Sequence, residues 1–88
     1  MAGSVGVNVG REGVEVAWET GEYEGPVIIK AVNAENGDVG ISKVDNDGYH
    51  FLTWPPGDYV DHISVYQDVD GEQGDLIAEG DISVHIGD

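Results

Sequence analysis

Two short acidic segments carry the residue types that bind calcium. Residues 45–48 (DNDG) and 68–72 (DVDGE) each bring several side-chain oxygens into a turn, and calcium takes six to eight oxygen ligands. Neither has EF-hand spacing, because the twelfth residue counted from Asp45 is Pro56, and Gln73 stands where the second segment needs its invariant glycine. Aspartate and asparagine also bond their own backbone in turns. We therefore predict plain turns with no metal ligand and no cofactor, and keep a structural calcium ion as the alternative.

Three histidines are the remaining candidates for a metal site or a catalytic base: His50, His62 and His85. None has a histidine two or four residues away. His62 with Ser64, and Ser83 with His85, share a strand face, but the sequence shows no orienting acid or oxyanion donor for either pair. Because 88 residues leave no insertion that would form a pocket, we predict exposed strand histidines, no catalytic residue and no enzyme.

The charge of the chain restricts its partners. Eighteen Asp and Glu side chains oppose Arg11, Lys30 and Lys43, which gives a formal net charge of −15. Such a field repels phosphate backbones and therefore excludes nucleic acid as a partner. It suits a cationic partner, divalent ions or a salt-rich environment, or simply a solvated surface. No apolar run approaches the roughly 20 residues that cross a bilayer, so the sequence predicts a soluble chain without a membrane partner.

Length and composition predict one domain over residues 1–88, with no linker and no internal repeat. The chain has no cysteine, so its stability does not depend on disulfides. Its first ten residues (MAGSVGVNVG) have neither a basic region nor a continuous apolar stretch, and so do not form an export signal. We expect either that the protein stays where it is made, or that a signal was removed and MAGS is a cloning remnant.

Apolar residues recur with a period of two along almost the whole chain, and no helical period is present. The turn sequences NG (36–37), NDG (46–48) and DG (70–71) suit tight hairpins. This pattern predicts an all-β fold: a seven-stranded antiparallel Ig-like (Greek-key) β-sandwich. The expected strands span residues 5–9, 14–19, 26–34, 38–44, 48–54, 59–67 and 76–86.

The alternation also predicts the core and one irregularity. The expected core comprises Val14, Val16, Trp18, Val27, Ile29, Ile41, Phe51, Ile63, Val65, Ile82 and Val84. Asp61 interrupts this pattern, because it falls on the same strand face as Tyr59, Ile63 and Val65. A β-bulge near Val60 and Asp61 would turn the carboxylate away from the core, and we expect one there.

Residues 45–59 (DNDGYHFLTWPPGDY) form the corner between two of these strands. Pro55 and Pro56 cannot donate to a ladder, so the strand must end there. Gly57 permits the reversal, and Tyr59 then begins the next strand, where its hydroxyl can reach back to the backbone as in a tyrosine corner.

The same segment resembles a recurring segment of immunoglobulin-like and prealbumin-like bacterial or viral sandwiches, including collagen-adhesin B-type repeats and carboxypeptidase regulatory-like domains. The matching elements are Asp47-Gly48, Tyr49-x-Phe51 and Pro56-Gly57-x-Tyr59. The resemblance covers about residues 26–86 and implies the fold only. The Lys–Asn isopeptide bond of many such repeats is not expected, because residues 5–9 lack lysine and residues 76–86 lack asparagine.

The sequence thus predicts a non-enzymatic structural or assembly module that docks on a protein of a larger particle, foremost a virion whose capsid it decorates. The chain begins with Met1, shows no export signal and forms a lone sandwich, and an acidic surface resists self-aggregation. The expected partner is therefore a capsid protein, and the expected location is the surface of a virion or another exposed particle. The alternative is an adhesin or carbohydrate-binding module excised from a surface protein, with or without a calcium ion.

Two surfaces are candidates for docking. Strands 5–9 and 76–86 are expected near sheet edges, where backbone groups can pair with a partner. Trp54 and Tyr66 form either a rim of the core or an exposed platform for sugar rings or a protein.

Overall fold

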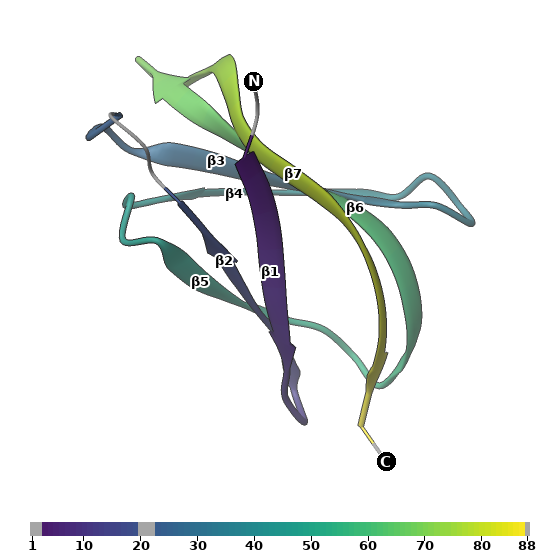
Figure 1. Ribbon diagram of the computed structural model, residues 1–88. Helices are drawn as coiled ribbons and strands as arrows, with labels where there is room; N and C mark the ends of the chain where they lie inside the picture. Colours follow the sequence, from purple (N-terminus) through teal and green to yellow (C-terminus); the bar gives the residue numbers. More distant parts are fainter. Residues whose placement is uncertain (1–2, 20–22, 88) are drawn as a thin grey trace.

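The computed structural model describes residues 3–19 and 23–87, and they form an all-β fold (Figure 1). The strands are β1 (Gly3–Val9), β2 (Gly13–Trp18), β3 (Val27–Asn33), β4 (Val39–Val44), β5 (Tyr49–Thr53), β6 (Gly57–Val69) and β7 (Glu72–Ile86). The described residues contain no helix, and so none that is long and apolar enough to cross a membrane. The all-β prediction is confirmed, with β6 and β7 longer than expected.

The strands form two antiparallel layers, and in Figure 1 β1 of one layer and β7 of the other both lie toward the viewer. One layer has the order β4-β3-β6-β7, and the other has the order β1-β2-β5. A short parallel pairing of Gly3 with Ala78 and of Ser4 with Glu79 connects the layers, because β1 starts beside β7 and then pairs with β2. β4 and β5 each pair with one strand only and are edge strands, and Val5–Val9 of β1 and residues 80–86 of β7 are likewise paired on one side only.

The core lies between the layers, where the alternating apolar residues of β2, β3, β6 and β7 meet. Nine predicted core residues are buried: Val14, Val16, Trp18, Val27, Ile29, Ile63, Val65, Ile82 and Val84. The core also includes Ala31, Ala78 and Ile86. Burial of this apolar surface is the main force that holds the two layers together.

Ile41 and Phe51, which were expected in the core, are exposed. Their side chains are 60% and 45% exposed, respectively. Ile41 pairs with Lys30, and Phe51 pairs with Glu15, so both occupy the outer faces of edge strands. Three inner positions, Gly40, Ser42 and His50, hold smaller or more polar residues, and the prediction failed because apolar character alone does not determine which face of an edge strand is buried.

The β-bulge expected at Val60 and Asp61 is also wrong. Asp61 pairs in regular register with Ile82, and the irregularities of β6 occur after Val65, closer to the β6–β7 hairpin. Asp61 faces inward and is buried, and its Oδ1 accepts a hydrogen bond from Asn33 Nδ2 at 2.9 Å. The partner amide from β3 satisfies the carboxylate, so no bulge is needed to remove it from the interior.

The tyrosine corner is present. The Tyr59 hydroxyl donates a hydrogen bond to the Pro55 carbonyl at 2.6 Å, and the Tyr59 ring lies 4.9 Å from the Trp54 ring. Strand β5 ends before the prolines, as expected, and β6 begins at Gly57, two residues earlier than predicted. The corner therefore fixes the end of β5 against the start of β6.

We expect Tyr59→Phe to lower the free energy of unfolding by about 1–2 kcal/mol, because the variant loses this hydrogen bond but keeps the ring contact with Trp54. Urea unfolding followed by tryptophan fluorescence measures the change. Tyr66→Phe serves as the control, since Tyr66 pairs across β3 and β6 away from the corner. Equal stabilities of the two variants would show that the corner bond contributes nothing.

Candidate functional site

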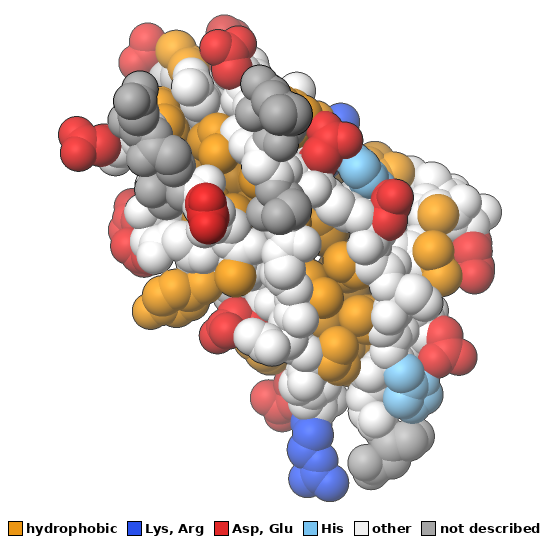
Figure 2. Space-filling model, viewed as in Figure 1, with side chains coloured by type: hydrophobic (Ala, Val, Ile, Leu, Met, Phe, Trp, Pro, Cys, Tyr) orange, Lys and Arg blue, Asp and Glu red, His pale blue; other side chains and the backbone are white. Residues whose placement is uncertain are grey.

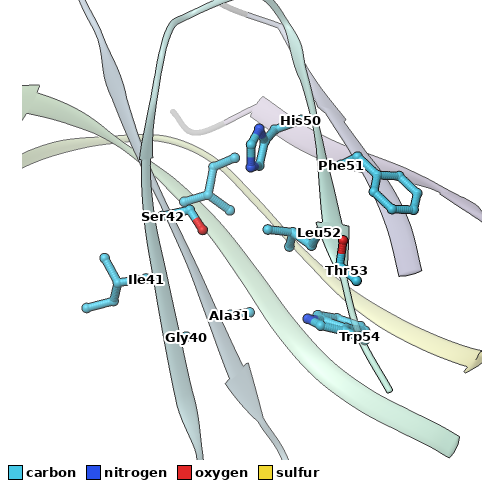
Figure 3. A pocket seen from close by; sticks show the side chains of 10 residues that line it. Ala31, Gly40, Ile41, Ser42, His50, Phe51, Leu52, Thr53 and Trp54 are labelled. Carbon is cyan, nitrogen blue, oxygen red and sulfur yellow. The ribbon is translucent and has the colours of Figure 1, made fainter. Parts of the chain in front are cut away.

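A groove runs between the two edge strands, where the layers leave the core partly uncovered. Its central hollow measures about 280 Å³, with Ile29 and Ala31 among the residues that line it. Ser42 of β4 and Leu52 of β5 point into it, whereas Ile41 and Phe51 point away (Figure 3). The hollow follows from the small inner residues of β4, which leave space that a larger apolar side chain would fill.

Two further hollows extend this groove along the edge strands. One shares His50 with the central hollow and is lined by Asp45, Asp47 and Asp68. The other shares Trp54 with the central hollow and is also lined by the residues Asn33, Asp38, Tyr59 and Asp61. We call the three together the edge groove. Its middle is lined by both apolar and polar side chains, with Ile29 and Leu52 beside Ser42 and His50, and carboxylates lie at both of its ends.

The backbone of β5 presents unpaired groups beside the edge groove. The Trp18 N–H donates to the Gly48 carbonyl, and the Trp54 N–H donates to the Glu12 carbonyl, each at 2.9 Å. Bonded pairs alternate along an antiparallel ladder, so the even positions 48–54 bond to β2. The N–H and C=O groups of Tyr49, Phe51 and Thr53 therefore point toward the free edge, where no described strand pairs with them.

Exposed aromatic side chains stand on the outer face of the same strand. Tyr49 is 59% exposed and pairs with Ala17, and Phe51 is 45% exposed beside Glu15. Between Tyr49 and Thr53 the strand contains no lysine, carboxylate or proline. Natural proteins commonly protect edge strands with such residues. β5 is thus an apolar, unprotected edge in an otherwise strongly acidic molecule.

Acidic side chains are spread over the β1 and β7 side of the molecule, which Figure 2 shows, and Asp45, Asp47 and Asp38 line the two ends of the edge groove. Lys43 lines the edge groove, and its ammonium donates to the Gly71 carbonyl at 2.7 Å. The field around the edge groove is therefore negative, which favours a cationic occupant.

The two acidic turns have structural roles. The Asp68 carboxylate accepts the Gly71 N–H at 2.8 Å, which is the backbone bond expected of a plain turn. Asn46 accepts the Trp18 Nε1–H at 3.0 Å and donates to the Tyr23 carbonyl at 2.8 Å, so it anchors the turn to the core. Within residues 3–19 and 23–87, no group of three or more side chains is arranged to hold a metal ion.

We expect salt to stabilise the domain, because 15 excess negative charges repel one another in the folded state. A gain of about 1 kcal/mol would raise the melting temperature by about 4–8 °C in a domain of this size. Thermal melts in sodium chloride measure the effect, with calcium chloride at matched ionic strength as the comparison. Calcium binding that saturates at low stoichiometry, and that is lost in Asp45→Ala or Asp68→Ala, would contradict the assignment of plain turns.

Two of the three histidines pair with acids from the neighbouring strand. His62 Nδ1 lies 2.7 Å from Asp81 Oδ1, and His85 Nδ1 lies 2.5 Å from Asp58 Oδ1. The sequence-based statement that these histidines lack an acid partner is therefore wrong, because β6–β7 pairing brings together residues far apart in sequence. His85 is exposed, as predicted, whereas His62 and His50 are half-buried. His50 faces the edge groove.

The structure separates Trp54 from Tyr66, so they do not form one platform. Trp54 packs on Tyr59 in the edge groove, whereas Tyr66 pairs with Ile28 in the other layer. Sequence reasoning missed the exposed pair Tyr49 and Phe51. A signal for it existed: once the corner places Trp54 inward, strict alternation places Phe51 outward.

The expectation that residues 5–9 and 76–86 lie near sheet edges agrees with the strand pairing. β1 meets β7 only through Gly3 and Ser4, so Val5–Val9 pair with β2 alone, and residues 80–86 of β7 pair with β6 alone. Docking through these two strands stays a prediction. β5 is the layer end that also carries the exposed aromatic side chains Tyr49 and Phe51.

Comparison of the chain with protein-family models, with curated proteins and with solved structures finds no match. The choice of a functional site therefore depends on the geometry and charge described above.

Proposed function

We propose that the chain is a non-enzymatic module that docks on a protein of a larger assembly through the edge of β5. The observation that carries this proposal is the combination of free backbone groups and exposed aromatic side chains at Tyr49 and Phe51. Aromatic residues are enriched in protein interfaces, and an unprotected edge strand is a ready template for pairing. Both features would be liabilities on a surface that binds nothing.

An Ig-like, seven-stranded Greek-key sandwich is the framework that we propose for this module. The strand orders β4-β3-β6-β7 and β1-β2-β5 support it, as does the bond from the Tyr59 hydroxyl to Pro55. In such sandwiches the chemistry resides in the surface that each member presents, so the framework itself does not determine the partner.

The charge of the molecule supports a basic protein partner. A net charge of −15 speeds the encounter with a positive surface and keeps displayed copies apart. A virion surface that displays many copies of one basic site is the first assembly to test, with a capsid protein as the partner.

The test is co-sedimentation of the tagged chain with purified particles from its source on a density gradient. The wild-type chain should sediment with the particles at a fixed ratio, and the double variant Tyr49→Ser with Phe51→Ser should remain at the top. A matched control, Val69→Ser with Leu76→Ser, removes exposed apolar side chains elsewhere and should sediment like the wild type. Equal sedimentation of both double variants would refute docking through β5.

The exposed aromatic pair also favours a second candidate, a carbohydrate-binding module. Tyr49 and Phe51 lie two residues apart on one strand face, where sugar rings can stack. Titration of the chain with soluble oligosaccharides, followed by the NMR signals of the two rings, tests this function. Saturable shifts confined to these rings would favour it over protein docking.

A further inference from the structure

We infer that the segment recognised at this site is an extended basic peptide, which adds to the free edge of β5 as a further strand. This inference rests on the proposed docking function and names the chemistry of its partner. In such β-augmentation, main-chain hydrogen bonds supply affinity and the side chains of alternate residues supply specificity.

The backbone of β5 sets the length of the added strand. Tyr49, Phe51 and Thr53 present outward N–H and C=O groups, two residues apart. The turn at Gly48 precedes them, and Pro55 follows them, so pairing is limited to a short run. A partner of about five paired residues fits this edge.

The edge groove indicates which side chains suit the inward positions of the added strand. Where an added strand pairs with the outward groups of Tyr49 and Phe51, its next residues lie opposite His50 and Leu52, which face the groove. The central hollow has Ile29 and Ala31 in its lining, so aliphatic side chains suit the inward positions. The outward positions contact water beside the exposed aromatics, and polar residues suit them.

Charge complementarity indicates which residues suit the two ends of the added strand. Asp45 and Asp47 are exposed at one end of the edge groove, and Asp38 is exposed at the other. Lys43, the cation that lines the groove, already donates to the Gly71 carbonyl. Lysine or arginine residues on both sides of an apolar centre would therefore face carboxylates.

The opposite edge, β4, is less suited to the same role. The Asn33 N–H bonds to the Asp38 carbonyl, so alternation leaves Val39, Ile41 and Lys43 with outward backbone groups on β4. The ammonium of Lys43 is one of the devices that protect an edge strand from pairing. β4 thus supplies a matched control, with the same geometry on the other side of the groove.

The probe is the synthetic peptide KKVTVTVKK with an acetylated and an amidated end, and the protein is the full chain. The sequence reads the same in both directions, so the orientation of binding does not have to be assumed. Isothermal titration should show one saturable site that weakens as sodium chloride is added. The acidic peptide EEVTVTVEE should show no binding.

Two changes test strand addition itself. N-methylation of the central Val and Thr residues removes the peptide's backbone donors, and Phe51→Pro removes an outward donor from β5 without removing a bond to β2. Each should weaken binding by about tenfold or more, because backbone hydrogen bonds are lost. Ile41→Pro makes the equivalent change on β4 and should alter affinity by less than about twofold.

Three outcomes would overturn the inference. They are the absence of peptide binding by the wild-type chain, full affinity of the N-methylated peptide, and loss of binding in Ile41→Pro but not in Phe51→Pro. The N-methylated peptide is tested on the wild-type protein, so the result stands even if Phe51→Pro does not fold. Co-sedimentation with particles tests docking separately, and docking without peptide binding would refute only the added strand.

Discussion

Gly13→Ala is expected to lower the free energy of unfolding by about 3–5 kcal/mol, which is a large fraction of the stability of a small domain. A Cβ atom at Gly13 would overlap the Leu52 carbonyl oxygen and would lie 2.9 Å from the Thr53 Cα. All the closest atoms belong to the backbone of β5, so no side-chain rotation relieves the clash. The variant must separate β5 from β2, and it thereby disturbs the strand that carries the proposed docking edge.

Gly6→Ala provides the matched control on the neighbouring strand β1. A Cβ atom at Gly6 would meet nothing within 4 Å. We expect it to change stability by less than about 0.5 kcal/mol. Denaturant unfolding of the two variants measures the difference, and equal stabilities would contradict the register of β2 against β5.

Trp18→Ala should lower the free energy of unfolding by about 3–5 kcal/mol, because it removes a buried aromatic side chain from the end of β2. The change also removes the hydrogen bond from Trp18 Nε1 to Asn46 Oδ1. Asn46 would then hold its turn only through its bond to the Tyr23 carbonyl. The turn leads directly into β5, so the loss should extend to the edge groove.

Trp18→Phe separates the two contributions of the tryptophan. Phenylalanine keeps most of the apolar surface but cannot bond to Asn46. We therefore expect the loss of this hydrogen bond to lower the free energy of unfolding by about 1–2 kcal/mol, in addition to the cost of the smaller ring, and the total to be below that of Trp18→Ala. Guanidinium unfolding followed by circular dichroism measures both variants. A loss below about 1 kcal/mol for Trp18→Ala would show that Trp18 lies outside the core.

The alternation of apolar and polar residues correctly predicted which residues of the inner strands face the core. In β2, Val14, Val16 and Trp18 face the core as expected, and Val27 and Ile29 do so in β3. A strand with one buried and one solvated face repeats its pattern every two residues, and the sequence retains that signal. The corner was also predictable, because proline and glycine act through local backbone geometry.

The candidate site was not predictable from the same pattern. On β4 and β5 the apolar residues Ile41 and Phe51 face solvent, whereas the polar residues Ser42 and His50 face the groove. An edge strand has a neighbour on one side only, so the burial of its residues depends on pairing that sequence alone does not show. Asp61 illustrates the same limit, since its partner Asn33 comes from another strand.

The proposed docking surface is β5, whereas the sequence favoured the first and last strands. Val5–Val9 and residues 80–86 are also paired on one side only, so they too are layer ends. β5 is preferred because it combines outward backbone groups with the exposed aromatic side chains Tyr49 and Phe51. A partner is therefore expected at the edge of β5.

The central claim is that this edge is open in the free protein and paired in the complex. Amide hydrogen exchange, followed residue by residue by NMR, tests it most directly. The Tyr49, Phe51 and Thr53 amides should exchange fast in the free protein, while the His50 and Leu52 amides, which bond to β2, should be protected. Saturation with KKVTVTVKK should slow the three fast amides and leave the others unchanged. Protection of all five amides in the free protein, or fast exchange of the outward three in the saturated complex, would contradict the claim.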